Sequence, residues 1–213
     1  LLRSLARRWS REAETSIRNG DIRRAVDFDL AILRLGNYLA RGGIRIHVQA
    51  AHGIKSDALL HLTILRDRLP YDLIPAVIDV LQRLDAGEEN PELTTARDRY
   101  WTDLAHGWRN RLESVVQRFL WIPSSETAAF QALKQPLSRE AAQRRLLGTE
   151  LALRSYRHDY GSYPESLADL LPKQMSYLPR DPFTQQPLIY RPVQFGYALY
   201  STGPDAQDDG GKF

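Results

Sequence analysis

The sequence predicts a mainly α-helical protein, a multi-helix bundle or stack of helical hairpins, with a small α+β end at the C-terminus. Two observations predict this fold. Apolar residues recur at three- and four-residue spacing through most of the first 160 positions, as on the inner face of helices. After Pro172 the pattern changes to short runs rich in aromatic and aliphatic residues, which favour strands. The 213 residues, 43% apolar and 26% charged, are typical of a globular chain.

The first two predicted helices cover residues 2–18 and 21–40. Between them, Asn19-Gly20-Asp21 offers a left-handed stop followed by an N-cap. The pair is similar to a single tetratricopeptide-type hairpin. No second copy follows at a spacing of about 34 residues, so a repeat array is not predicted. The residues expected on the inner face of the first helix are Leu2, Leu5, Trp9, Ala13 and Ile17.

Prolines and polar loops divide the rest of the helical region. Pro70 is expected to end a third helix, and Pro136 is expected to precede the last one. The chain therefore divides at this proline, with an all-helical part over 1–135 and an α+β part over 136–213. The predicted helices after the second are 44–69, 72–84, 94–121, a short one that follows Ser124-Ser125, and 138–160.

The C-terminal part should end in a β-hairpin. The runs 188–191 and 195–201 are separated by a few turn residues, which is the pattern of two antiparallel strands. Asp181 precedes Pro182, and its carboxylate is expected to cap the turn that leads into the hairpin. We therefore interpret Asp181 as architectural.

Charge and composition exclude several classes of function. The net charge is only +3 and is spread among 26 acidic residues, so no nucleic-acid-binding stripe is predicted. No cysteine is present, which excludes disulfides and thiolate chemistry. The arginines at 3, 7 and 11 share one helical stripe, which suits either an acidic or phospholipid surface or an ordinary solvated face.

No catalytic signature is found, and the prediction is that the protein is not an enzyme. The sequence has no nucleophile-elbow serine motif, no phosphate-binding glycine loop and no HExxH pair. Three histidines lie on one predicted helix, but His52 points away from His47. His61 shares a face with His47 at a distance of about 21 Å, so the three cannot bind one metal ion.

The chain begins at Leu1 without a methionine, and we expect it to be a piece of a longer product. No run of about 18 apolar residues occurs, so this piece is expected to be soluble. Contact with a membrane is expected only through a signal or anchor that would stand upstream.

The last third of the chain resembles the C-terminal half of the type II secretion major pseudopilins. The resemblance rests on the helix that ends at Tyr160-Gly161, the Tyr163-Pro164 step, the segment LPRDPF at 178–183, and LYSTGPD at 199–205 running into DDGG at 208–211. It is also similar to the tail of exported bacterial proteins in which such an end follows a helical region. The resemblance implies a bacterial envelope, periplasmic or exported protein.

A calcium ion is the cofactor that this resemblance implies. In the pseudopilins this part of the tail binds calcium, and Asp205, Asp208 and Asp209 stand at the matching positions just after the 199–201 strand. Clustered carboxylates between glycines also suit calcium chemically, because the ion takes six to eight oxygen ligands from a loop that can wrap around it. The alternative is a solvated acidic tail. Here the chain ends at Phe213, whereas the pseudopilin loop continues through further acidic residues.

Three hypotheses for the function remain open at this point. The first is a non-enzymatic envelope or exported protein that makes protein–protein contacts and has a calcium-stabilised tail. The second is a helical adaptor that holds a peptide or partner helix in a groove of the N-terminal bundle. The third is an enzyme with an unfamiliar site. The residues expected to line the adaptor's groove, as partner-binding residues, are Trp9, Phe28, Trp101 and Trp108.

Overall fold

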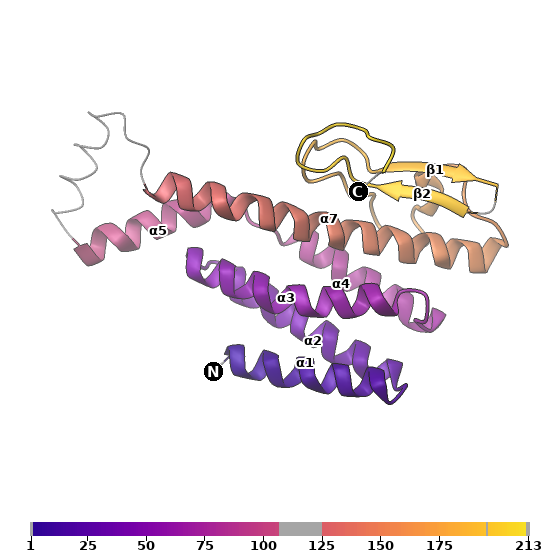
Figure 1. Ribbon diagram of the computed structural model, residues 1–213, viewed down its shortest axis with the longest axis horizontal. Helices are drawn as coiled ribbons and strands as arrows, with labels where there is room; N and C mark the ends of the chain where they lie inside the picture. The colour runs from indigo at the N-terminus through magenta and orange to yellow at the C-terminus, as the bar shows by residue number, and fades with distance from the viewer. Residues whose placement is uncertain (1, 107–124, 195, 212–213) are drawn as a thin grey trace.

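The computed structural model describes residues 2–106, 125–194 and 196–211. Its helices run side by side along the longest axis, and a two-stranded sheet lies over the C-terminal half of the long helix α7 (Figure 1). This architecture confirms a mainly α fold with a small α+β end. In chain order the elements are α1 (Leu2–Arg18), α2 (Ile22–Ala40), α3 (Arg45–Leu65), a 3₁₀ turn (Tyr71–Leu73), α4 (Ile74–Ala86), α5 (Pro91–His106), α7 (Ser125–Tyr160), a 3₁₀ turn (Leu167–Leu170), β1 (Ile189–Val193) and β2 (Gly196–Tyr200).

The turn between α1 and α2 forms as predicted. Gly20 has a φ of +77°, in the left-handed region that glycine tolerates without steric cost. Asp21 caps α2, since its carboxylate accepts a hydrogen bond of 3.1 Å from the Arg24 backbone N–H. The stop and the cap together turn α2 back along α1.

The inner face of α1 differs in part from the prediction. Ala13 is buried, and Trp9 and Ile17 pack against the core, but Leu2 and Leu5 remain 38% and 36% exposed. The buried face is centred on small residues, which allow α1 to lie close to its neighbours. Leu2 and Leu5 therefore stay at the exposed margin near the start of the helix. The buried residues of α1 are Ala6, Ser10, Ala13 and Ser16.

The prediction that Pro136 separates two helices is wrong. A single helix, α7, runs from Ser125 to Tyr160 with Pro136 inside it. Proline removes one backbone hydrogen bond and crowds the carbonyl four residues earlier, which bends a helix but does not always end it. The expected division between residues 135 and 136 thus falls within a continuous helix.

The hydrophobic core extends from the helices into the C-terminal end. It is formed mainly where α2, α3, α4 and α7 face one another, and it includes Leu170 and Met175 from the segment after α7. Fully buried side chains at its centre include Leu33, Leu62, Leu65, Val77 and Leu151. The α+β end is therefore seated on the same core as the helices.

The predicted hairpin is confirmed. β1 and β2 pair antiparallel, with Ile189 opposite Tyr200 and Val193 opposite Gly196. Tyr190 donates a hydrogen bond of 2.7 Å to the carbonyl of Pro164, which fastens the hairpin to the segment that follows α7.

Asp181 has the architectural role expected of it. Its side chain is 1% exposed and accepts hydrogen bonds from the backbone N–H of Phe183 (2.8 Å) and of Thr202 (2.8 Å). Burial acts to raise the pKa of this carboxyl, but the hydrogen bonds outweigh burial and lower it. The charged carboxylate thus joins the turn before β1 to the residues just after β2.

Candidate functional site

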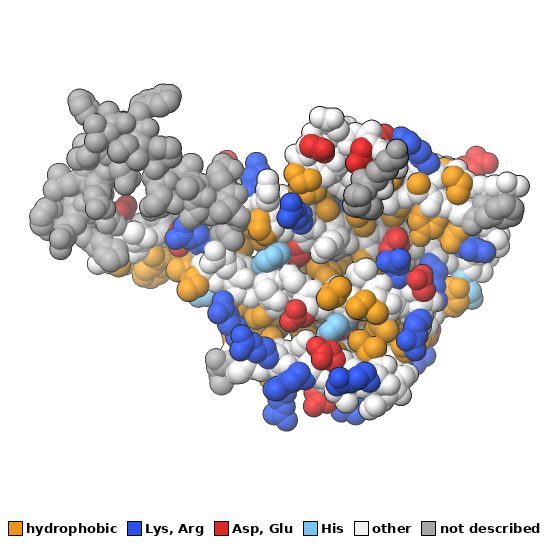
Figure 2. All heavy atoms as spheres, viewed as in Figure 1, with side chains coloured by type: hydrophobic (Ala, Val, Ile, Leu, Met, Phe, Trp, Pro, Cys, Tyr) orange, Lys and Arg blue, Asp and Glu red, His pale blue; other side chains and the backbone are white. Residues whose placement is uncertain are grey.

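The first candidate site is the acidic tail, a loop that follows β2 at one end of the hairpin (Figure 1), and Figure 2 shows acidic side chains on this part of the surface. Asp208 is held by three groups there. Its Oδ1 accepts hydrogen bonds from the Tyr200 hydroxyl (2.8 Å) and the Gly210 N–H (3.0 Å), and its Oδ2 lies 2.6 Å from the Arg191 guanidinium. The hydrogen bond from Tyr200 is the largest cause that lowers the pKa of Asp208. This carboxylate is therefore charged and already paired.

The other two tail aspartates are turned to their own backbone. Asp205 accepts a hydrogen bond from the Gln207 N–H (3.3 Å), and Asp209 accepts one from the Gly211 N–H (3.2 Å). Across the described ranges 2–106, 125–194 and 196–211, no three histidine, cysteine, aspartate or glutamate side chains converge as a metal-binding group. The loop as it stands holds Asp208 through arginine and tyrosine, and calcium ligation would require the loop to rearrange.

The second candidate site is the aromatic groove expected in the N-terminal bundle. Trp9 packs against the core, and Phe28 on α2 is half-buried with the Arg24 guanidinium carbon 5.8 Å from its ring centre. Trp101 belongs to α5, which extends away from α1 and α2 (Figure 1). Trp108 lies outside the described residues. The structure thus places Trp101 apart from Trp9 and Phe28.

The α5 helix carries a row of exposed apolar side chains, of which the sequence predicted only Trp101 as a binding residue. Leu93, Tyr100, Trp101 and Leu104 are 55%, 64%, 54% and 64% exposed. At about 100° per residue, Leu93, Tyr100 and Leu104 lie within a narrow sector of the helix, and Trp101 lies beside it. We call these four residues the α5 apolar face.

Few contacts hold α5 against the other helices. Its main packing partner among the described elements is α3, where Arg45 forms an ion pair of 3.4 Å with Asp98. A second ion pair joins Arg97 to Glu89 in the loop before α5, and Glu89 also accepts a hydrogen bond from the Gly42 N–H. Charged contacts therefore position the base of α5, while its apolar face is left uncovered.

A buried ionic cluster joins α3, α4 and α7. At its centre is Glu140, whose side chain is 3% exposed. The carboxylate lies 2.8 Å from His52 Nδ1, 2.7 Å from Lys55 Nζ and 3.0 Å from Arg144 Nη1. Burial acts to raise the pKa of Glu140, but the hydrogen bond from His52 and the charges of Lys55 and Arg144 lower it to about 2.

Arg144 extends the cluster to α4 and the loop after it. Its Nη2 lies 3.1 Å from Asp85 and 3.1 Å from Glu88, and the neighbouring Arg145 lies 2.6 Å from Asp85. Tyr177 donates a hydrogen bond of 3.2 Å to the other oxygen of Asp85, and burial raises the pKa of this tyrosine to about 12. We call Glu140, Arg144, Arg145, Asp85, Glu88, His52 and Lys55 the ionic cluster.

The three histidines of α3 have three different partners. His47 accepts a hydrogen bond from the Ile44 N–H (3.3 Å), and His52 belongs to the ionic cluster. His61 is buried and its Nδ1 lies 2.9 Å from Asp29 of α2. This carboxylate partner is 32 positions away in the sequence and carries no local signal.

Comparison with protein-family models, with curated proteins and with solved structures finds no match. Among the described helices, none combines the length and apolarity that a membrane crossing requires.

Proposed function

We propose that this protein is non-enzymatic, that it belongs to the bacterial envelope or is exported, and that it binds a protein partner through the α5 apolar face. The observation that carries the proposal is the exposure of four large apolar side chains on one helix that, among the residues the structure describes, makes few contacts with the other helices. Exposed apolar side chains gathered on one face mark surfaces that bind another protein. Aromatic residues supply much of the binding energy at such contacts.

The partner that fits this face is an amphipathic helix. Leu93, Tyr100 and Leu104 repeat at seven- and four-residue spacing, which is the row that a second helix covers when it packs alongside. This proposal keeps the adaptor hypothesis but moves its surface from a groove lined by Trp9 and Phe28 to α5, because those two side chains are partly covered by the bundle.

The C-terminal end has a supporting role in the proposal. Its resemblance to the type II secretion pseudopilins favours an envelope or exported location and a tail that calcium makes rigid. Asp205, Asp208 and Asp209 would supply carboxylate oxygens to the ion. Asp208 would then exchange its contact with Arg191 for the metal.

The experiment is to measure the size of the complex that the protein forms when it is expressed at native level in a bacterial host. Sedimentation of the detergent-free extract should place the 24.4 kDa chain in a larger assembly. Leu104→Glu should return it to the mass of the free chain, because a charge in a desolvated apolar contact is costly. Cell fractionation of the same strain tests the envelope location.

Val193→Glu is the matched control, since Val193 is 60% exposed but lies on β1, away from α5. This variant should remain in the assembly. The proposal fails if Leu104→Glu stays in the assembly as fully as the control, or if the unaltered chain sediments alone.

A further inference from the structure

A cavity of about 300 Å³ lies where α5 and α7 meet the ends of α2 and α3. Part of its wall is apolar and comes from four helices: Ala40 of α2, Val48 of α3, Leu84 of α4, and Leu137 and Ala141 of α7. Sites for small molecules are commonly concave, mostly apolar and of about this volume or larger. The cavity therefore has the size and the lining of a small-molecule site.

The polar part of the wall is predominantly basic. Seven lysine and arginine residues line the cavity, against three carboxylates, Glu88, Glu89 and Asp98. Each of these carboxylates already has an arginine partner. Glu88 pairs with Arg144 and Arg145, Glu89 with Arg97, and Asp98 with Arg45.

Positive charge remains after this pairing. Arg41 and Lys134 line the cavity, and neither forms an ion pair within the part of the chain that the structure describes, although the charge of Arg41 helps to lower the pKa of Glu89. Glu140 and Asp85, just behind the wall, offset part of the charge of Lys55, Arg144 and Arg145. The cations still exceed the carboxylates, so the potential in the cavity favours an anion.

A buried donor without a partner also faces this part of the structure. The Arg144 side chain is 3% exposed and lines the cavity, and its Nε has no hydrogen-bond partner. An unpaired buried N–H costs free energy comparable to a lost hydrogen bond, and more in a charged group. An anion in the cavity would give this guanidinium a further acceptor.

We infer that this cavity binds a small organic anion that has an apolar body and one carboxylate or phosphate group. The apolar body would lie against Val48, Leu137 and Ala141, and the anionic group would face Arg144 and the rim cations Arg41 and Lys134. This inference is independent of the partner contact on the α5 apolar face.

The probe for the test is 8-anilinonaphthalene-1-sulfonate, an apolar anion whose fluorescence rises when it leaves water. Titration should saturate at one site per chain. Decanoate, a carboxylate with an apolar chain, and inorganic phosphate are then added separately as competitors. Displacement of the probe by decanoate alone supports a carboxylate ligand with an apolar body. Displacement of the probe by phosphate points to a ligand that bears a phosphate group. If neither competitor displaces the probe, the inference is overturned.

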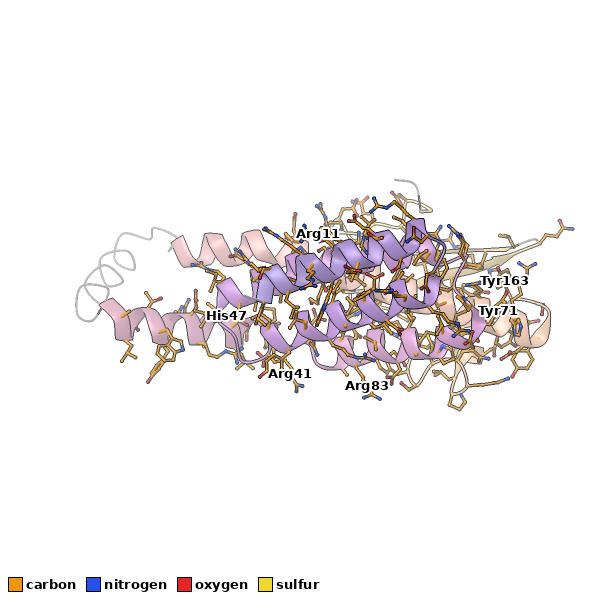
Figure 3. All side chains as sticks on the ribbon, turned by 90° about the horizontal axis from the view of Figure 1, so that it is seen from below. Arg11, Arg41, His47, Tyr71, Arg83 and Tyr163 are labelled. Atoms are coloured by element: carbon orange, nitrogen blue, oxygen red, sulfur yellow. The ribbon has the colours of Figure 1, made fainter. Side chains whose placement is uncertain are left out.

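Two pairs of variants show whether the probe occupies this cavity. Val48→Trp fills the apolar wall and should weaken binding about tenfold or more, whereas Val193→Trp on exposed β1 is the matched control. Arg41→Gln removes a rim cation and should weaken binding about threefold or more. Its control is Arg11→Gln on α1, on the other side of the bundle from Arg41 (Figure 3).

The inference fails if Val48→Trp and Arg41→Gln bind the probe as tightly as their controls. Arg41 is exposed, so Arg41→Gln keeps the test valid even if Val48→Trp does not fold. Leu104→Glu separates this site from the proposed function. It should leave probe binding unchanged, and a loss of binding in that variant would place the probe on the α5 apolar face instead and overturn the cavity site.

Discussion

Glu140 is the residue on which the ionic cluster depends. Its carboxylate has His52, Lys55 and Arg144 around it, and removing one member of a buried charged group leaves the others unpaired. Glu140→Gln should therefore lower the free energy of unfolding by about 3–5 kcal/mol, measured by urea denaturation.

Glu150→Gln is the control for this change, because Glu150 lies on the same helix and is 3.7 Å from a single arginine, Arg66. Burial raises the pKa of Glu150, so its charged form contributes little to stability. We expect a loss of about 1 kcal/mol or less in the control. Equal losses in the two variants would contradict the account of the cluster.

Glu140 should also determine how the free energy of unfolding falls at acidic pH. Its pKa is lowered from 4.5 to about 2, so the folded state holds its proton less tightly than the unfolded state. The resulting stability is fully present above pH 4.5 and is lost as the pH falls towards 2, in total about 3 kcal/mol. Between pH 5 and pH 3, urea denaturation should show about 2 kcal/mol of this loss in the unaltered protein and much less in Glu140→Gln.

The buried pair His61–Asp29 should have the opposite effect on the free energy of unfolding, which it should lower as the pH rises. The hydrogen bond that His61 donates to Asp29 raises the pKa of His61, and burial raises the pKa of Asp29 to about 6. Both groups therefore bind protons more tightly in the folded state. The part due to Asp29 is lost as the pH rises through about 6, and the part due to His61 is lost above pH 6.5.

Titration by NMR tests this pair. The His61 ring signals should titrate with a midpoint above pH 6.5. Asp29→Asn should lower this midpoint, because His61 then no longer donates a hydrogen bond to a carboxylate. A midpoint that is the same in both proteins would show that Asp29 does not hold the His61 proton.

At the scale of elements, the sequence predicted those features whose signals are local. The turn at Gly20-Asp21 needs one left-handed residue and one capping carboxylate, and both are adjacent in the chain. The hairpin likewise follows from two neighbouring runs. The prediction failed at Pro136, because whether a helix continues through a proline depends on what the rest of the helix packs against, and α7 is held along α4.

The candidate site was less predictable because its parts are distant in the sequence. In the ionic cluster, Lys55, Asp85 and Arg144 come from three helices, and each alone looks like a member of a solvated face. The α5 apolar face could not be predicted in full from the sequence, because periodicity shows that a helix has an apolar side but not what covers it.

The ion pair between the hairpin and the acidic tail provides a test of whether the tail binds calcium. Arg191→Gln should lower the melting temperature in EDTA slightly, because it removes the ion pair to Asp208, and exposed ion pairs contribute little to stability. If the tail binds calcium, the arginine competes with the metal. Millimolar calcium should then stabilise Arg191→Gln more than it stabilises the unaltered protein, and magnesium should not.

Asp208→Ala is the control, because it removes the proposed ligand as well as the ion pair. This variant should lose the response to calcium. If calcium and magnesium change the melting temperature equally in the unaltered protein and in both variants, the tail is a solvated acidic loop and not a calcium site.

At the scale of the whole molecule, the fold separates a rigid body from an exposed helix. The core and the ionic cluster hold α2, α3, α4, α7 and the hairpin together, whereas among the described residues α5 is attached mainly by the ion pairs of Arg97 and Asp98, midway along it. A helix held in this way can present its apolar face to another protein without disturbing the core. The central claim is therefore that contact with a partner is made on α5.

Site-specific photo-crosslinking in cells tests this claim most directly. A benzoylphenylalanine replaces Tyr100 of α5 in one strain and Tyr38 of α2, which is 79% exposed, in the other. We predict a discrete cross-linked partner from position 100 that is absent from position 38 and is lost when Leu104→Glu is added. Cross-links to the same partner from both positions, or from position 38 alone, would contradict the claim.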